Sequence, residues 1–150
     1  MHSGPEASTV EPTGKPLSDV VFFDGVCGLC NRVVQFLLRE DHDRKFLFSP
    51  LQGETIKHIK GAKNAIGNNN TIVVLCAPGP GVQLLVRSDA AIYIFSKLPR
   101  FRWLSRIGSL FPRFLRDMVY RLIAAIRYKL WGKSLRCRVP TAQEIHRFIP

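Results

Sequence analysis

Residues 20–31 read Val-Val-Phe-Phe-Asp-Gly-Val-Cys-Gly-Leu-Cys-Asn, and this stretch decides how the rest of the chain is interpreted. Four apolar residues typical of a strand run into an Asp-Gly turn, and a helical apolar pattern begins at the cysteines. A strand that delivers Cys-x-x-Cys to the first turn of a helix is the arrangement that a dithiol redox site needs. The stretch therefore predicts that Cys27 and Cys30 form a redox pair.

The position of the two cysteines predicts how they divide the chemistry. At the start of a helix, the unpaired backbone N–H groups and the positive end of the helix dipole favour a thiolate over a thiol. Such a setting lowers a cysteine pKa from about 8.5 to roughly 3.5–7.5. We expect Cys27 to be the more exposed residue and the attacking thiolate, and Cys30 to resolve the mixed disulfide. Gly28 is expected to leave room for an incoming disulfide.

Asp24, three residues before the first cysteine, has two candidate roles. A partly buried carboxylate could take and return the proton of Cys30 during exchange. Alternatively, it could accept hydrogen bonds from backbone N–H groups of the turn or of the helix start. The sequence leaves both roles open, and they are compatible with each other.

A zinc site is the main competing interpretation of the two cysteines. Zinc needs two or more further ligands at suitable spacing, and Cys137 and His146 are the distant candidates. Because these two do not form a zinc knuckle, we predict no metal and no cofactor. Cys76, which ends an apolar run, and Cys137 are interpreted as structural cysteines.

The length and charge of the chain set limits on its organisation. With 150 residues, of which 46% are hydrophobic, it can form one domain with a substantial core. We expect a disordered tail over residues 1–17 and a single domain over residues 18–150. From Lys97 onward there are thirteen basic residues against Asp117 and Glu144, so the whole net charge of +11 lies in the last third of the chain. This asymmetry suits an acidic partner, although a solvated basic face is the simpler explanation.

The N-terminal residues lack the basic and apolar regions of a signal peptide, and no apolar run reaches the length of a transmembrane helix. The sequence therefore predicts a cytoplasmic protein whose four cysteines are thiols.

The order of predicted elements indicates the fold class. We expect strands at residues 20–23, 46–48, 71–76 and 82–86 and helices at residues 27–39, 52–60, 89–97, 100–110 and 112–131, with a loop at 61–70 and Ser88 as a helix N-cap. The first strands should pair in parallel through a helical crossover, and the last two should form an antiparallel hairpin. This order predicts an α/β fold, with a thioredoxin-like mixed sheet flanked by helices and a basic, helical C-terminal extension.

The last predicted helix is amphipathic. Leu115, Met118, Val119, Leu122 and Ile126 share one face, and the opposite face carries Arg113, Arg116, Tyr120 and Arg127. Such a helix could lie on a membrane surface. Because an apolar stripe usually packs on the protein's own core, we expect this one to face the sheet.

Residues 24–31 resemble the signature of the DCC family of thiol-disulfide oxidoreductases, which is named after its Asp-x-x-Cys-x-x-Cys pattern. Further similar segments follow in the family's order, at residues 48–52, 87–90 and 127–132, and at Cys137 and Pro140. The resemblance implies a thioredoxin-like fold and dithiol exchange by Cys27 and Cys30. It also implies that Ser88, Asp89 and the Arg127-Tyr128 pair have a role, without saying which.

The chain departs from related patterns at two places. Ile126 stands where many DCC members have Asn, and Thr71 stands where thioredoxins place the cis-proline that shapes substrate docking. Ile126 removes any polar role at its position, and the missing proline concerns substrate handling and leaves the exchange chemistry in place.

The sequence thus predicts an enzyme that exchanges its Cys27–Cys30 dithiol or disulfide with a protein or small-molecule thiol or disulfide. One alternative is a non-enzymatic module whose basic C-terminal third binds nucleic acid or an anionic membrane. Of these two ligands nucleic acid is disfavoured, and peripheral membrane contact through the C-terminal helices stays open. A further alternative is a haloacid-dehalogenase-type phosphatase with Asp24 as nucleophile, but Val26 stands where that chemistry needs a second acid.

Overall fold

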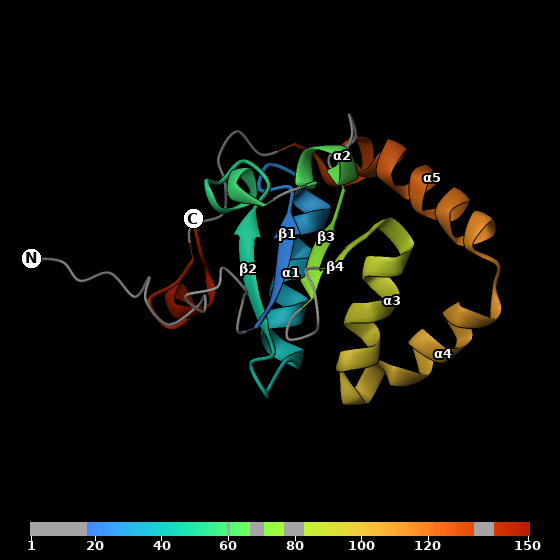
Figure 1. Cartoon of the computed structure of the whole chain (residues 1–150), viewed down its shortest axis with the longest axis horizontal. Coiled ribbons are helices and arrows are strands. Elements are labelled where there is room, and N and C mark those ends of the chain that lie inside the picture. The colour runs from blue at the N-terminus through green and yellow to red at the C-terminus, as the bar shows by residue number, and fades with distance from the viewer. Residues whose placement is uncertain (1–17, 60, 67–70, 77–82, 134–139) are drawn as a thin grey trace, which may run out of the picture.

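The computed structural model describes residues 18–59, 61–66, 71–76, 83–133 and 140–150 (Figure 1). The predicted tail at residues 1–17 and Cys137 lie outside these residues. The elements are β1 (Asp19–Phe23), α1 (Gly28–Glu40), β2 (Phe46–Pro50), α2 (Ala62–Ile66), β3 (Val73–Cys76), β4 (Gln83–Val86), α3 (Arg87–Lys97), α4 (Arg102–Leu110) and α5 (Arg113–Trp131), with 3-10 turns at Thr55–His58, Pro99–Phe101 and Ile145–Arg147.

The four strands form one mixed sheet in the order β2-β1-β3-β4. β1 pairs in parallel with β2, as a helical crossover requires, and antiparallel with β3. β3 and β4 form the predicted antiparallel hairpin at the edge of the sheet. The fold class is therefore confirmed: a mixed α/β structure whose sheet order and directions match a thioredoxin-like core.

β1 is buried on both faces because alternate side chains enter two separate cores. Val21 and Phe23 pack with residues of α1 and α3, whereas Val20 and Phe22 pack on the other face with Ile56 and Ala62. This strand ends at Phe23, directly before Asp24, so the position of the Cys-x-x-Cys turn is fixed by a central strand of the sheet.

The middle of the chain differs from the prediction in three details. The expected helix at 52–60 is only a short 3-10 turn, and the expected loop at 61–70 contains α2. Ser88 is not an N-cap, since α3 begins one residue earlier and Val86 precedes it. The Ser88 hydroxyl instead donates a hydrogen bond to Asp117 of α5.

The orientation of α5 contradicts the prediction. Met118, Val119, Leu122 and Ile126 are exposed, and Leu115 is only partly buried, so the apolar stripe does not pack on the sheet. The face turned toward α1 and α3 is the polar one, which carries Arg116, Tyr120 and Arg127. The physical reason is that Arg127 and Arg116 form ion pairs with Asp24 and Asp89, and Tyr120 forms a hydrogen bond with Thr71.

Candidate active site

The two cysteines lie at the N-terminus of α1, as predicted. Cys27 is the N-cap residue, with extended backbone angles, and Cys30 lies in the first helical turn. Both are free thiols. Cys27 is 0% exposed and Cys30 is 4% exposed, so the expectation that Cys27 would be the accessible thiol is wrong.

The chain's own residues 131–133 cover Cys27. Gly132, with φ of 76°, ends α5 in the left-handed region that favours glycine. Its carbonyl accepts the Gly28 N–H at 3.2 Å, and Lys133 forms an isolated antiparallel bridge with Cys27. A Cβ on Gly28 would lie 2.3 Å from the Trp131 carbonyl oxygen. The missing side chain of Gly28 therefore makes room for this covering segment, residues 131–133, and not for an incoming disulfide.

Asp24 is buried and its carboxylate is fully engaged. Oδ1 accepts the Val26 backbone N–H at 3.2 Å and the Gln52 side-chain amide at 2.9 Å. Oδ2 accepts a hydrogen bond from the Tyr128 hydroxyl and lies 3.5 Å from the Arg127 guanidinium. The turn-stabilising role considered for Asp24 is thus present.

Arg127 of α5 connects Asp24 with the dithiol. Its Nη1 lies 3.7 Å from the Cys30 sulfur, and its Nη2 lies 3.5 Å from Asp24 and 3.3 Å from the Tyr128 hydroxyl. The Arg127 side chain is almost completely buried. A buried guanidinium is stable only when its charge is compensated, and here the Asp24 carboxylate supplies the opposite charge while the Tyr128 hydroxyl and the Cys30 sulfur provide further polar contacts.

Burial first, and then the neighbouring Cys27, raise the pKa of Cys30 from 9.0 to about 12, whereas Arg127 acts in the opposite direction. Burial by itself would lower the pKa of Arg127, but the acidic groups around it, with Cys30 first, raise it overall. In the resting reduced protein Cys30 therefore keeps its proton, and Arg127 is the charge that favours losing it. The Asp24 charge is partly compensated by Arg127, which reduces its repulsion of a thiolate.

Three groups of contacts fix α5 in the position that brings Arg127 to the dithiol. Asp117 accepts a hydrogen bond from Ser88. Asp89 forms ion pairs with Arg113 at 2.9 Å and Arg116 at 3.4 Å. The Tyr120 hydroxyl accepts hydrogen bonds from the Thr71 hydroxyl at 2.8 Å and the Ile72 N–H at 3.0 Å. Thr71, two residues before the start of β3, thus contacts α5.

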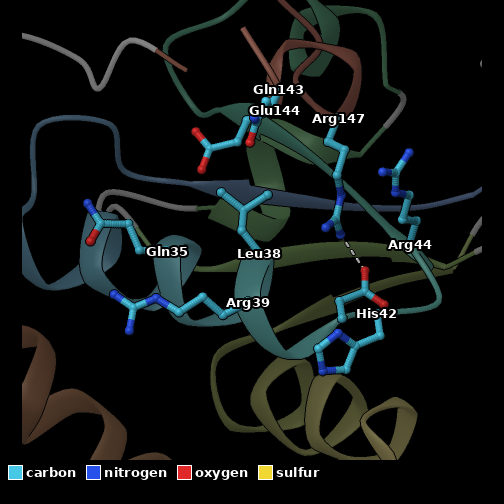
Figure 2. Close-up of a pocket in the computed structure, with 9 residues that line it drawn as sticks. Gln35, Leu38, Arg39, His42, Arg44, Gln143, Glu144 and Arg147 are labelled. Carbon is cyan, nitrogen blue, oxygen red and sulfur yellow. Dashed lines mark hydrogen bonds and ion pairs between the residues drawn. The ribbon is translucent and has the colours of Figure 1, made fainter. Parts of the chain in front are cut away.

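A cavity of about 360 Å³ adjoins Cys30 between α1, α3 and α5. Its walls are mostly apolar, with Val33, Phe36 and Ile94 among them, and Arg127 lines it beside the sulfur. A larger cavity of about 520 Å³ lies at the other end of α1, and Arg39, Arg44 and Arg147 are among the residues that line it (Figure 2). Arg147 is neutralised there by its ion pair with the buried Asp41. Of the two cavities, the smaller one adjoins Cys30.

The other titratable candidates lie elsewhere. Cys76 is partly buried at the end of β3, and burial raises its pKa. Within the described ranges, no three His, Cys, Asp or Glu side chains gather as metal ligands would. No helix in that part of the chain is long and apolar enough to cross a membrane.

Comparison with known proteins agrees with this geometry. The family model for DCC1-like thiol-disulfide oxidoreductases matches residues 21–133, which include the cysteines, Asp24, Arg127 and the covering segment. The chain belongs to this family. The uncharacterized protein YuxK of Bacillus subtilis is 38% identical over 134 residues, covering 87% of this chain and 93% of YuxK. A chloroplastic DCC family protein of Arabidopsis thaliana is 31% identical over 122 residues, covering 80% of this chain and 69% of the plant protein. No solved structure matches the chain.

For this member of the DCC1-like family, the structure places Arg127, Tyr128 and Gln52 at the site, although the sequence did not assign them a role. The Arg127-Tyr128 pair was part of the resemblance, but its role was open, and Gln52 was only part of a similar segment. Arg127 and Tyr128 are distant from the cysteines in sequence, and a polar stripe on an amphipathic helix normally faces solvent. The available signal in the sequence was that Arg127 and Tyr120 share the helix face opposite the apolar stripe.

Proposed function

We propose that the protein is a thiol-disulfide oxidoreductase in which Cys27 is the nucleophile, Cys30 the resolving thiol and Asp24 the proton acceptor. The observation that carries this proposal is the Arg127 guanidinium, which contacts both the Cys30 sulfur and Asp24 at the start of α1. Membership of a thiol-disulfide oxidoreductase family supports the same class of activity.

The proposed exchange has two steps. The Cys27 thiolate attacks a disulfide of the substrate, forms a Cys27–substrate mixed disulfide and expels the first substrate thiolate. Cys30 then gives its proton to Asp24, attacks the Cys27 sulfur and expels the second thiolate, and protons from Asp24 and water neutralise the leaving groups. The substrate gains two electrons, and the protein ends with a Cys27–Cys30 disulfide.

Arg127 is the proposed positioning residue for the second step. As Cys30 loses its proton, a negative charge develops next to a fixed positive charge in a buried site, where such an interaction is strong. Gln52 and Tyr128 hold the Asp24 carboxylate in place by hydrogen bonds. Asp24 and Tyr128 in turn hold the Arg127 guanidinium. Because Cys27 is covered, the exchange also requires the covering segment to move away from the helix start.

The proposal treats residues 18–150 as one thioredoxin-like domain in which helices 100–131 complete the site. Contacts of α5 with α1 and α3 support this single domain. The proposal also places the protein in the reducing cytoplasm, where the dithiol is the resting state. The substrate is proposed as a protein or small-molecule disulfide.

Trapping of mixed disulfides tests the assignment. With a small aromatic disulfide as probe, Cys30→Ser should accumulate a Cys27 adduct detectable by mass spectrometry, and Cys27→Ser should accumulate none. Cys76→Ser serves as the matched control and should behave as the unsubstituted protein. Adduct formation at Cys30 or Cys76 in place of Cys27 would contradict the proposed roles.

The role of Asp24 needs a separate measurement. Asp24→Asn keeps a side chain of the same size but cannot accept the Cys30 proton. It should form the mixed disulfide and resolve it slowly, and the resolution rate should recover as the pH rises. A resolution rate and pH profile equal to those of the unsubstituted protein would limit Asp24 to a structural role.

A further inference from the structure

The outward faces of α4 and α5 form an apolar surface, here called the α4–α5 face. Among the described residues, every exposed large apolar side chain except Ile145 lies on or between these helices: Trp103, Ile107, Leu110, Phe111, Phe114, Met118, Val119, Leu122, Ile123, Ile126, Leu130 and Trp131. Single exposed apolar residues are common on soluble proteins, but a contiguous set of this size marks an interaction surface.

The spacing shows that each helix presents one continuous stripe. Trp103, Ile107 and Leu110 are separated by four and three residues on α4, and Phe114, Met118, Leu122 and Ile126 by four residues on α5. Leu110 and Phe114, where α4 turns into α5, are 83% and 75% exposed. Both helices lie on the same side of the molecule, away from β2 (Figure 1).

The exposure follows from the active site. The opposite face of α5 supplies Arg127 and Tyr128 to Asp24, and Tyr120 to the start of β3. The helix cannot turn its apolar stripe toward the core without withdrawing these buried side chains. The α4–α5 face is therefore left without a partner inside the described part of the chain.

The charge around this face indicates the partner. Residues 97–133 contain ten basic residues and a single acidic one, Asp117, which is engaged by Ser88. Arg102 and Arg106 are exposed on α4, and Arg121 and Lys129 are exposed on α5. Two copies of such a surface would repel each other, whereas an anionic surface would attract it.

We propose that the α4–α5 face docks on the surface of an anionic phospholipid bilayer. Helices with Trp, Phe and Leu on one face and Arg and Lys at its border lie in the plane of the interface, with the apolar side chains at the acyl boundary and the cations near the phosphates. No described helix is able to cross the membrane, so the contact is peripheral. Because Trp131 belongs to the covering segment over Cys27 and Leu130 directly precedes that segment, the docked surface lies next to the redox site.

The two tryptophans of the chain, Trp103 and Trp131, both lie on this face and provide a built-in probe. Full-length protein is mixed with vesicles of phosphatidylcholine alone or of phosphatidylcholine with 30% phosphatidylglycerol. We expect a blue shift of tryptophan emission and co-sedimentation with the anionic vesicles, both weakening as salt is raised. The neutral vesicles should bind far less.

Matched variants separate the apolar and electrostatic contributions. Leu110→Glu and Phe114→Glu should each weaken vesicle partitioning about ten-fold or more, whereas Ile145→Glu, an exposed apolar residue outside the face, should not. Arg121→Gln and Lys129→Gln should each weaken it about five-fold, and Lys63→Gln, exposed on α2, should not. Circular dichroism confirms that each variant keeps the fold.

Several results would overturn the docking proposal. These are the absence of a blue shift with anionic vesicles, equal binding to neutral vesicles, binding that survives Leu110→Glu, and a salt-sensitive complex with nucleic acid in place of vesicles. A concentration-dependent dimer that Leu110→Glu dissociates would assign the face to a second copy instead. Cys27→Ser should bind vesicles like the unsubstituted protein, so failure of docking and failure of the redox function can be distinguished.

Discussion

The sheet region, residues 18–98, and the α4–α5 region, residues 99–133, bury opposite kinds of side chain. In β1 and α1 most of the buried residues are aliphatic or aromatic, with Phe22 and Leu37 as examples. In α5 the buried residue is Arg127, while Leu122 and Phe114 are exposed. The apolar pattern identifies a helix in both regions, but it identifies the buried face only where the neighbouring surface is also apolar.

The α4–α5 region is tied to the sheet region by polar contacts, because the surface it meets contains Asp24, Cys30, Asp89 and Thr71. A helix that completes a buried ionic site must point its charged side chains inward, and its apolar side chains are then turned outward. The difference between the regions therefore reflects the polar contacts of α5, above all the buried pair of Arg127 and Asp24.

The largest expected effect is the difference in stability cost between an apolar residue of the sheet region and one of the α4–α5 region. Phe22→Ala empties a fully buried site in the sheet region and should reduce the free energy of unfolding by about 3–5 kcal/mol. Leu122→Ala, on the exposed face of α5, should change it by less than about 0.5 kcal/mol. Urea unfolding of both variants measures the contrast. A cost above about 2 kcal/mol for Leu122→Ala would mean that the apolar stripe of α5 is packed.

The second expected effect concerns the two sides of α5. Arg127→Met leaves the buried Asp24 without its cation and should cost about 3 kcal/mol, while Arg121→Met on the exposed side should cost little. Removing both charges in Asp24→Asn/Arg127→Met should restore part of the stability. A double variant that loses the full sum of the single costs would show that the two side chains are not coupled.

The third expected effect tests the contact between the covering segment and α1. The Cβ of Gly28→Ala would meet the Trp131 carbonyl at 2.3 Å, so residues 131–133 must shift, at a cost of about 1–3 kcal/mol. Iodoacetamide should then alkylate Cys27 faster than in the unsubstituted protein. Gly108→Ala in α4, where a Cβ would lie 3.3 Å from a flexible Ile92 side chain, is the control and should leave the rate unchanged.

The smallest expected effect is a pH dependence of stability above pH 9. The pKa of Cys30 rises from 9.0 to about 12 on folding, so between these values the unfolded chain has lost a proton that the folded protein keeps. Stability due to this residue is therefore complete below pH 9 and decreases as the pH rises toward 12, so that only a small part of it is lost just above pH 9. Under reducing conditions, thermal unfolding of Cys30→Ala should show a shallower alkaline decrease than the unsubstituted protein. Equal slopes would contradict the raised pKa.

Sequence reasoning succeeded where local pattern and fold agree. The apolar run at residues 20–23, the Cys-x-x-Cys at the start of a helix and the Thr-Ile-Val-Val run before Cys76 were all placed correctly, because strand and helix preferences act over a few neighbouring residues. The parallel pairing of β1 with β2 followed from the helical crossover.

Sequence reasoning failed where a contact joins distant residues. Arg127 lies 97 residues from Cys30, and nothing in the local pattern of α5 shows that its polar face meets a buried carboxylate. The exposure of Cys27 was also mispredicted, since the residues that cover it come from the end of α5.

The sequence by itself determined the class of the fold, the dithiol and its place at a helix start, because these depend on short-range patterns along the chain. Only the tertiary structure decided which face of α5 is buried, which residues surround Cys30 and what covers Cys27. The physical reason is that burial of a charge depends on the compensating groups it meets. Asp24 and Arg127 meet only when β1 and α5 are packed together.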